Sequence, residues 1–154
     1  MTAVALLVRQ IQRGQEGFLR MVNLVPEDKL DWQPDPKLRS ALDQYQEVAT
    51  ILDFTWDVFD RRELKFEAED FQRYMAHSKT FTTREACEAE FRRTTEELIA
   101  RVRALSDADL DDEVKMPFPG EYRLCDTIQY HVWNMAYHEG QIAAILQRLG
   151  VDPM

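Results

Sequence analysis

The sequence contains little glycine, proline or cysteine. Its 154 residues include 5 Gly, 6 Pro and 2 Cys, whereas Ala, Leu, Glu, Gln and Arg are plentiful. This composition favours helices. Cys87 and Cys125 share no CxxC spacing, which argues against a zinc knuckle and a disulfide. We therefore expect reduced thiols in a cytoplasmic protein.

Long apolar runs and uncompensated basic clusters are also absent. No apolar run approaches the ~20 residues that span a bilayer, and the first residues lack the basic start and the cleavage site of a signal peptide. The net charge is −9, and basic pairs such as Arg61-Arg62 have acids close by, which argues against a nucleic-acid surface. We expect one domain over residues 1–154, with neither nucleic acid nor membrane as a partner.

Apolar residues recur at helical spacing in four long segments. Two segments begin with a start signal, in which a side-chain oxygen caps a free backbone N–H; the signals are Ser40 with Asp43 and Thr82 with Glu85. The predicted helices run from about Ala3 to Asn23, from Ser40 to about Asp60, from Thr82 to about Leu105, and from about Leu124 to Leu149, where Gly150 stops the last one.

The connections between these helices differ in length. The second connection is charged and is predicted to hold a short helix from about Ala68 to Met75, and residues 113–122 form a loop with a few extended residues. Trp32 lies in the first connection and is expected to pack on the core. Four helices without a strand pattern predict an all-α, antiparallel four-helix bundle. The long second connection leaves the up-and-down order open.

Polar residues interrupt two apolar stripes. His138 shares a helix face with Met135 and Ile142, and Glu47 shares one with Ile51 and Phe54. His138 is either a hydrogen-bonded core histidine or part of a site. Glu47 is either half exposed, or buried and then paired, protonated or bound to a cation, because a buried carboxylate is costly. Ligand sites in bundles are built from such facing side chains.

The fourth predicted helix is expected to be the most buried, with His138 facing the bundle interior. Gly140 lies inside this helix, where glycine costs ~1 kcal/mol relative to alanine. Close approach of another helix or of a ligand would explain it. His131 lies two turns from His138, ~10 Å along the axis, and is a poor substitute ligand. His77 lies in the variable connection and is assigned to no site.

Two stretches resemble the DinB/YfiT-like superfamily. "YHEGQIAAILQRLG", residues 137–150, resembles its closing motif, usually H-x3-H-R-G-Q followed by an apolar run and Leu-Gly. "LDWQPDPKLRSALDQYQEVA", residues 30–49, resembles the W-x-P…S start of its second helix, which normally leads to a histidine seven positions after the serine. The resemblance implies a four-helix bundle and, in many members, a divalent metal held by three histidines.

Only one of the three histidines is kept at the matching positions. His138 matches the last ligand, whereas Asn134 and Glu47 stand where the other two histidines are expected, and Glu139 replaces the usual arginine. The resemblance thus implies a degenerate metal site formed by Glu47, Asn134 and His138. Carboxylate, amide and imidazole groups can all ligate a metal. The implied cofactor is one divalent ion (Zn, Ni or Mn). Because carboxylate and amide oxygens are harder ligands than imidazole nitrogens, this site should bind Mn or Mg relatively better than a site of three histidines would.

The resemblance leaves two functions open. The first is a metal-dependent hydrolase or thiol-dependent S-transferase that acts on a small molecule or a low-molecular-weight thiol. The alternative is a metal-free small-molecule-binding or stress-response module, in which the same residues form a closed polar cluster. No catalytic residue can be named from the sequence. A homodimer is expected by analogy with the family.

Overall fold

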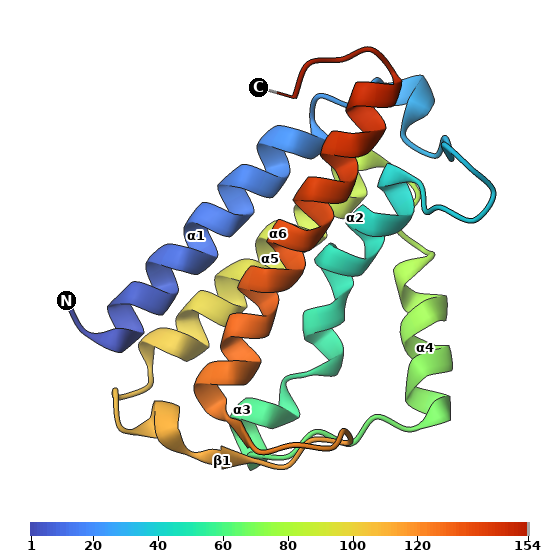
Figure 1. Cartoon of the computed structure of the whole chain (residues 1–154). Coiled ribbons are helices and arrows are strands. Elements are labelled where there is room, and N and C mark those ends of the chain that lie inside the picture. Colours follow the sequence, from blue (N-terminus) through green and yellow to red (C-terminus); the bar gives the residue numbers. More distant parts are fainter. Residues whose placement is uncertain (154) are drawn as a thin grey trace.

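Four long helices form a bundle in the computed structural model, which describes residues 1–153 (Figure 1). Each of α1 and α2 packs against both α5 and α6. The all-α four-helix bundle expected from the sequence is therefore confirmed. The bounds of the four helices are Ala3–Val22 for α1, Ala41–Thr50 for α2, Arg84–Arg103 for α5 and Leu124–Arg148 for α6.

The directions of the helices differ from a fully antiparallel bundle. α1 and α6 run one way, and α2 and α5 run the other way (Figure 1). Arg84 Nη1 at the start of α5 donates to the Val22 carbonyl at the end of α1, over 2.6 Å. α2 and α5 share a direction because α4, Ala68–Ser78, carries the chain back along the bundle before α5 begins. The neighbouring pairs α2–α5 and α1–α6 are thus parallel, and the antiparallel prediction was wrong for both pairs.

Short elements complete the connections. They are three 3-10 turns, η1 (Glu27–Lys29), η2 (Ile51–Phe54) and η3 (Asp109–Asp111), the helix α3 (Asp57–Arg61), and the strands β1 (Glu113–Val114) and β2 (Tyr122–Arg123). The strands pair antiparallel, with Glu113 opposite Arg123, at the end of the bundle where α6 begins. The few extended residues predicted here are confirmed. Among residues 1–153, no helix is long and apolar enough to cross a membrane.

The second helix is shorter than predicted. Ser40 caps it as expected, because its Oγ accepts from Asp43 N over 3.1 Å. It ends at Thr50 instead of near Asp60, and continues as η2 and then α3. Thr50 Oγ1 donates to the Gln46 carbonyl over 2.7 Å, and such bonds to the preceding turn weaken and bend helices.

The third long helix begins one residue later than its start signal predicted. Thr83, not Thr82, is the N-cap of α5, and its side chain accepts from Ala86 N over 3.2 Å. Two adjacent threonines precede this helix, and the pattern of the sequence does not decide between them. The cap still supplies the helix with one acceptor for its free N–H groups.

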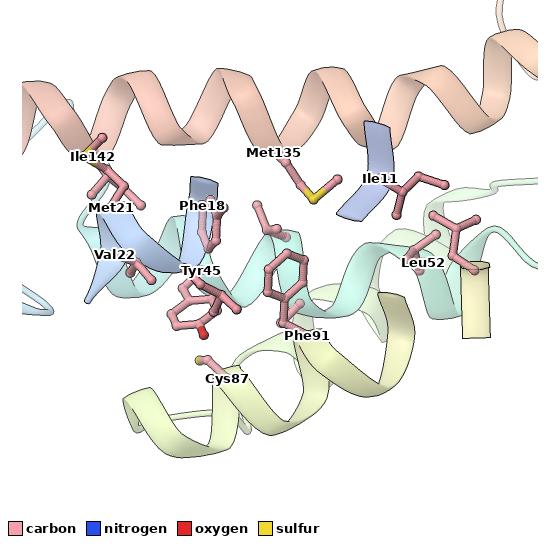
Figure 2. Close-up of a cluster of buried hydrophobic side chains, with 14 of the residues drawn as sticks. Ile11, Phe18, Met21, Val22, Tyr45, Leu52, Cys87, Phe91, Met135 and Ile142 are labelled. Carbon is pink, nitrogen blue, oxygen red and sulfur yellow. The ribbon is translucent and has the colours of Figure 1, made fainter. Parts of the chain in front are cut away.

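Three aromatic rings form the centre of the core (Figure 2). Phe18 of α1 meets Tyr45 of α2 at 5.3 Å and Phe91 of α5 at 5.4 Å between ring centroids, both edge-on. All three residues are at most 1% exposed. Edge-on aromatic pairs add to the free energy gained from burial alone. The core therefore joins three helices at one point.

The most buried helix is α2, not α6. Seven of the ten residues of α2 are buried, against nine of the 25 residues of α6. α2 packs on α5 and α6 on one side and on α4 on the other, so little of it remains at the surface. The expectation for the last helix was wrong, but His138 does face the interior, with 1% exposure.

Close helix packing occurs at glycines that the sequence analysis did not single out. A Cβ on Gly14 would lie 2.8 Å from Met135 Cε, and one on Gly17 would lie 2.8 Å from Glu139 Oε2. α1 therefore lies directly on α6 at these two positions. Gly140 has nothing within 4 Å of an added Cβ, so the close approach of another helix expected there was wrong.

Trp32 packs against the core from its loop, as expected, but remains partly exposed. Trp32→Ala should therefore lower the free energy of unfolding by about 1–3 kcal/mol, less than the 3–5 kcal/mol typical of fully buried aromatics. Urea unfolding would measure the change, with Leu38→Ala, an exposed loop position, as the control. A loss no larger than that of the control would show that the indole contributes no packing.

Candidate functional site

The three side chains that the sequence predicted as a site lie together. Glu47 projects from α2, and Asn134 and His138 project from neighbouring turns of α6. Glu47 Oε1 lies 3.1 Å from His138 Nε2 and accepts a hydrogen bond from Asn134 Nδ2, also over 3.1 Å. One carboxylate oxygen thus meets both α6 residues.

Two glutamines orient the His138 ring. Its Nδ1 lies 3.1 Å from Gln44 Oε1 and 3.2 Å from Gln141 Oε1. Both partners present acceptor oxygens, to which Nδ1 donates in the tautomer that carries its proton there. The sequence analysis missed these two residues. The available signal was their spacing, since Gln44 precedes Glu47 by three residues and Gln141 follows His138 by three.

Glu47 is held as a carboxylate. Burial opposes its charge, but hydrogen bonds from His138 and Arg39 outweigh burial and lower the pKa of Glu47 to about 2. Arg39 Nη1 pairs with Oε2, the oxygen that the α6 residues leave free. Arg39 also pairs with Asp43, which in turn pairs with Lys79. The sequence did not point to this charge network.

A cavity of about 330 Å³ opens beside Glu47. Arg39, Asp43 and Glu47 form its polar end, and side chains of η2, α4 and the segment before α4 form its apolar walls, among them Ile51, Phe66 and Tyr74. Burial raises the pKa of Tyr74, so its hydroxyl stays protonated. His138 does not line this cavity, whereas Glu47 both lines it and contacts His138.

The donor set leaves room for a cation between Glu47 and His138. Nδ1 and Nε2 of His138 both face acceptor oxygens, and a neutral imidazole has only one N–H to offer them. A positive charge stabilises this contact, either as a second proton on the ring or as a metal ion. Histidines that ligate metals usually donate their other N–H to an oxygen, as Nδ1 can here. The residues therefore fit a divalent cation.

Two features make this site weaker than a site of three histidines. Arg39 already neutralises Glu47, so an added cation meets a nearby positive charge. Asn134 donates its amide N–H to Glu47, and would have to present Oδ1 to ligate a metal. Thiolate and imidazole ligands favour softer metals, whereas the carboxylate oxygen of Glu47 and the amide oxygen of Asn134 favour harder ones.

A model of the DinB superfamily matches residues 10–142 of this sequence. The chain belongs to the DinB superfamily. A crystal structure of a DinB-like protein, YjoA from Bacillus subtilis, is similar in fold, with a TM-score of 0.67 and 16% sequence identity over 94% of this chain and 91% of that one. None of the curated proteins compared with the chain matches it. The fold and family inferred from the sequence are thus confirmed.

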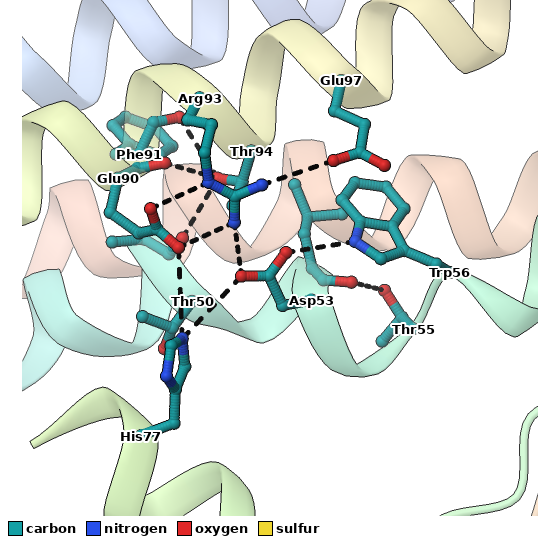
Figure 3. Close-up of polar contacts among 12 residues, drawn as sticks. Thr50, Asp53, Thr55, Trp56, His77, Glu90, Phe91, Arg93, Thr94 and Glu97 are labelled. Carbon is teal, nitrogen blue, oxygen red and sulfur yellow. Dashed lines mark hydrogen bonds and ion pairs between the residues drawn. The ribbon is translucent and has the colours of Figure 1, made fainter.

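A second group in this DinB chain could also hold a metal ion. Asp53, His77 and Glu90 offer ligand atoms that all lie within 4.8 Å of one another (Figure 3). They come from η2, α4 and α5, and the sequence analysis had assigned His77 to no site. Arg93 now bridges the two carboxylates, so a metal ion would have to displace its guanidinium group.

Proposed function

We propose that this DinB protein binds a divalent cation at Glu47, Asn134 and His138 and acts on a small molecule as a hydrolase or a thiol-dependent S-transferase. The observation that carries the proposal is the close approach of Glu47 Oε1 and His138 Nε2, which lie 3.1 Å apart on facing helices. When bound, a divalent cation would lower the pKa of a coordinated water or thiol. The homodimer and the cytoplasmic location stay predictions.

The remaining residues of the cavity would bind and orient the substrate. Arg39 is 41% exposed at the polar end of the cavity and can meet an acidic group of the substrate. Tyr74 can donate a hydrogen bond, because its hydroxyl stays protonated. Ile51 and Phe66 offer apolar contacts. These features support a small substrate with one acidic and one apolar part.

The second candidate function is metal-free binding of a small molecule. The Arg39–Glu47 ion pair favours it, because the carboxylate is already neutralised without a metal. In this case a proton, and not a metal ion, stabilises the contact between Glu47 and His138. The cavity and its polar end are the same in both candidates, so the presence of the metal decides between them.

A metal titration tests the proposal. Protein purified without a histidine tag should gain thermal stability on addition of Mn²⁺, Zn²⁺ or Ni²⁺. At ten times the Kd, a ligand that binds only the folded state stabilises by about 1.4 kcal/mol, or about 3–6 °C in Tm. His138→Ala should abolish the gain. Asn134→His should enlarge it for Zn²⁺ and Ni²⁺, because it places two histidines one turn apart on α6.

His77→Ala is the matched control for the second group. If the gain in Tm disappears in His77→Ala and persists in His138→Ala, the ion binds at Asp53, His77 and Glu90, and the proposed site is wrong. Absence of any gain in the wild type and in Asn134→His would reject the metal and support the metal-free candidate.

A further inference from the structure

A larger cavity lies near the start of α6. Its volume is about 410 Å³, within the range of small-molecule sites. Ile51 and Phe66 line both this cavity and the one beside Glu47, so the two adjoin. The walls of the larger cavity come from α3, the segment before α4, the β1–β2 loop and α6, and include Val58, Phe59, Phe118, Tyr122 and Tyr130. None of the residues in the Glu47, Asn134 and His138 site lines it.

One buried polar ring also lines this apolar cavity. His131 projects from α6 and is 7% exposed. Burial lowers the pKa of His131 to about 3, so the imidazole is neutral near pH 7. A neutral imidazole has one hydrogen-bond donor and one acceptor. Among the described residues, the ring contact found for His131 is an edge-on one with Tyr130 at 5.7 Å. A polar ring in this position can serve a ligand in the cavity.

The charges around the cavity disfavour an anionic ligand. Its described lining contains no Lys or Arg, and its single charged residue is Asp126. The chain carries a net charge of −9. An anion would find no partner here and would be repelled, and burial of an unpaired charge of either sign among apolar side chains is costly. The aromatic walls favour a flat ring, because rings stack offset or edge-on.

We propose that this cavity binds an uncharged aromatic small molecule that carries one hydroxyl or carbonyl group, with His131 as its hydrogen-bond partner. This site does not depend on a metal at Glu47, and it stands if the proposed function fails. Because the two cavities adjoin at Ile51 and Phe66, a bound aromatic molecule would lie next to the polar end at Glu47.

Calorimetric titration of the full chain at pH 7 tests the class of ligand. The probes are 1-naphthol, which is uncharged and carries one hydroxyl, naphthalene, which lacks it, and 1-naphthalenesulfonate, which is an anion. We expect 1-naphthol to bind more tightly than naphthalene, by about 3- to 10-fold, as one hydrogen bond would give. The sulfonate should bind at least tenfold more weakly than 1-naphthol. Equal or tighter binding of the sulfonate, or no binding of 1-naphthol, would overturn the proposal.

Variants locate the site. His131→Phe keeps a ring but removes the hydrogen bond, so 1-naphthol should lose about 3- to 10-fold in affinity while naphthalene keeps its affinity. Thr127→Trp fills the cavity from α6 and should weaken both ligands more than tenfold. Gln129→Trp, an exposed position on the same helix, should change neither by more than about twofold. If Thr127→Trp folds and binds both ligands like the wild type, they bind elsewhere and the proposal is wrong. If Thr127→Trp does not fold, the affinity of His131→Phe for 1-naphthol decides whether the proposal holds.

Discussion

Phe18→Ala should lower the free energy of unfolding by about 3–5 kcal/mol, the range for truncating a fully buried aromatic side chain. Phe18 is completely buried and meets Tyr45 and Phe91 edge-on. Its removal leaves a cavity at the point where three helices join, and it also removes two ring contacts. Since domains of this size are stable by about 5–15 kcal/mol, the variant should lose a large fraction of its stability.

Phe118→Ala is the matched control for this truncation. Phe118 is 55% exposed in the β1–β2 loop, and the same change there should cost less than about 1 kcal/mol. Urea unfolding followed by circular dichroism gives both values. A cost for Phe18→Ala below about 2 kcal/mol would show that the core relaxes into the space and that the three rings are not its centre.

Glu47 should make the protein sensitive to acid. Its pKa is lowered from 4.5 to about 2 by hydrogen bonds from His138 and Arg39, against the opposing effect of burial. A pKa lowered in the folded state stabilises the protein above the unfolded value, and this stability is lost as the pH falls through the folded value. The shift corresponds to roughly 3 kcal/mol, and we expect about 2 kcal/mol because the side chain is 22% exposed. The loss should occur between about pH 4.5 and pH 2.

Glu47→Gln isolates this contribution. The variant lacks the titrating group, so its free energy of unfolding should lie about 2 kcal/mol below the wild type at pH 5.5. The two should converge as the pH approaches 2. Glu69→Gln, at an exposed position on α4, should instead follow the wild type at every pH. A constant difference between Glu47→Gln and the wild type from pH 5.5 to pH 2 would mean that Glu47 does not titrate as the structure implies.

The fold could be predicted because local signals and apolar stripes agree along each long helix. Ser40 caps α2, and Gly150, with φ of +74°, follows α6. The length of α2 and the directions of the helices could not be predicted. The end of α2 coincides with the hydrogen bond from Thr50 to the Gln46 carbonyl, which no sequence pattern marks. The helix directions follow from the path of α4, whose position relative to the bundle the sequence does not give.

The candidate site could be predicted only in part. Glu47 and His138 each interrupt an apolar stripe, and the family resemblance placed both, together with Asn134, in one site. Arg39 was not predicted, because an arginine near a helix start has many available partners and the sequence does not choose among them. His77 was missed for a related reason. Its group is assembled from three elements without a shared spacing, so only the folded chain brings the residues together.

The pairing of α1 with α6, which includes the positions of Gly14 and Gly17, has a consequence for folding during synthesis. This helix pair is the most extensive in the bundle, yet residues 23–123 separate its two members. A nascent chain therefore exposes the part of α1 that packs on α6 until α6 leaves the ribosome, and contacts between such distant segments slow folding. Chains released before α6 is made should aggregate instead of forming a smaller bundle.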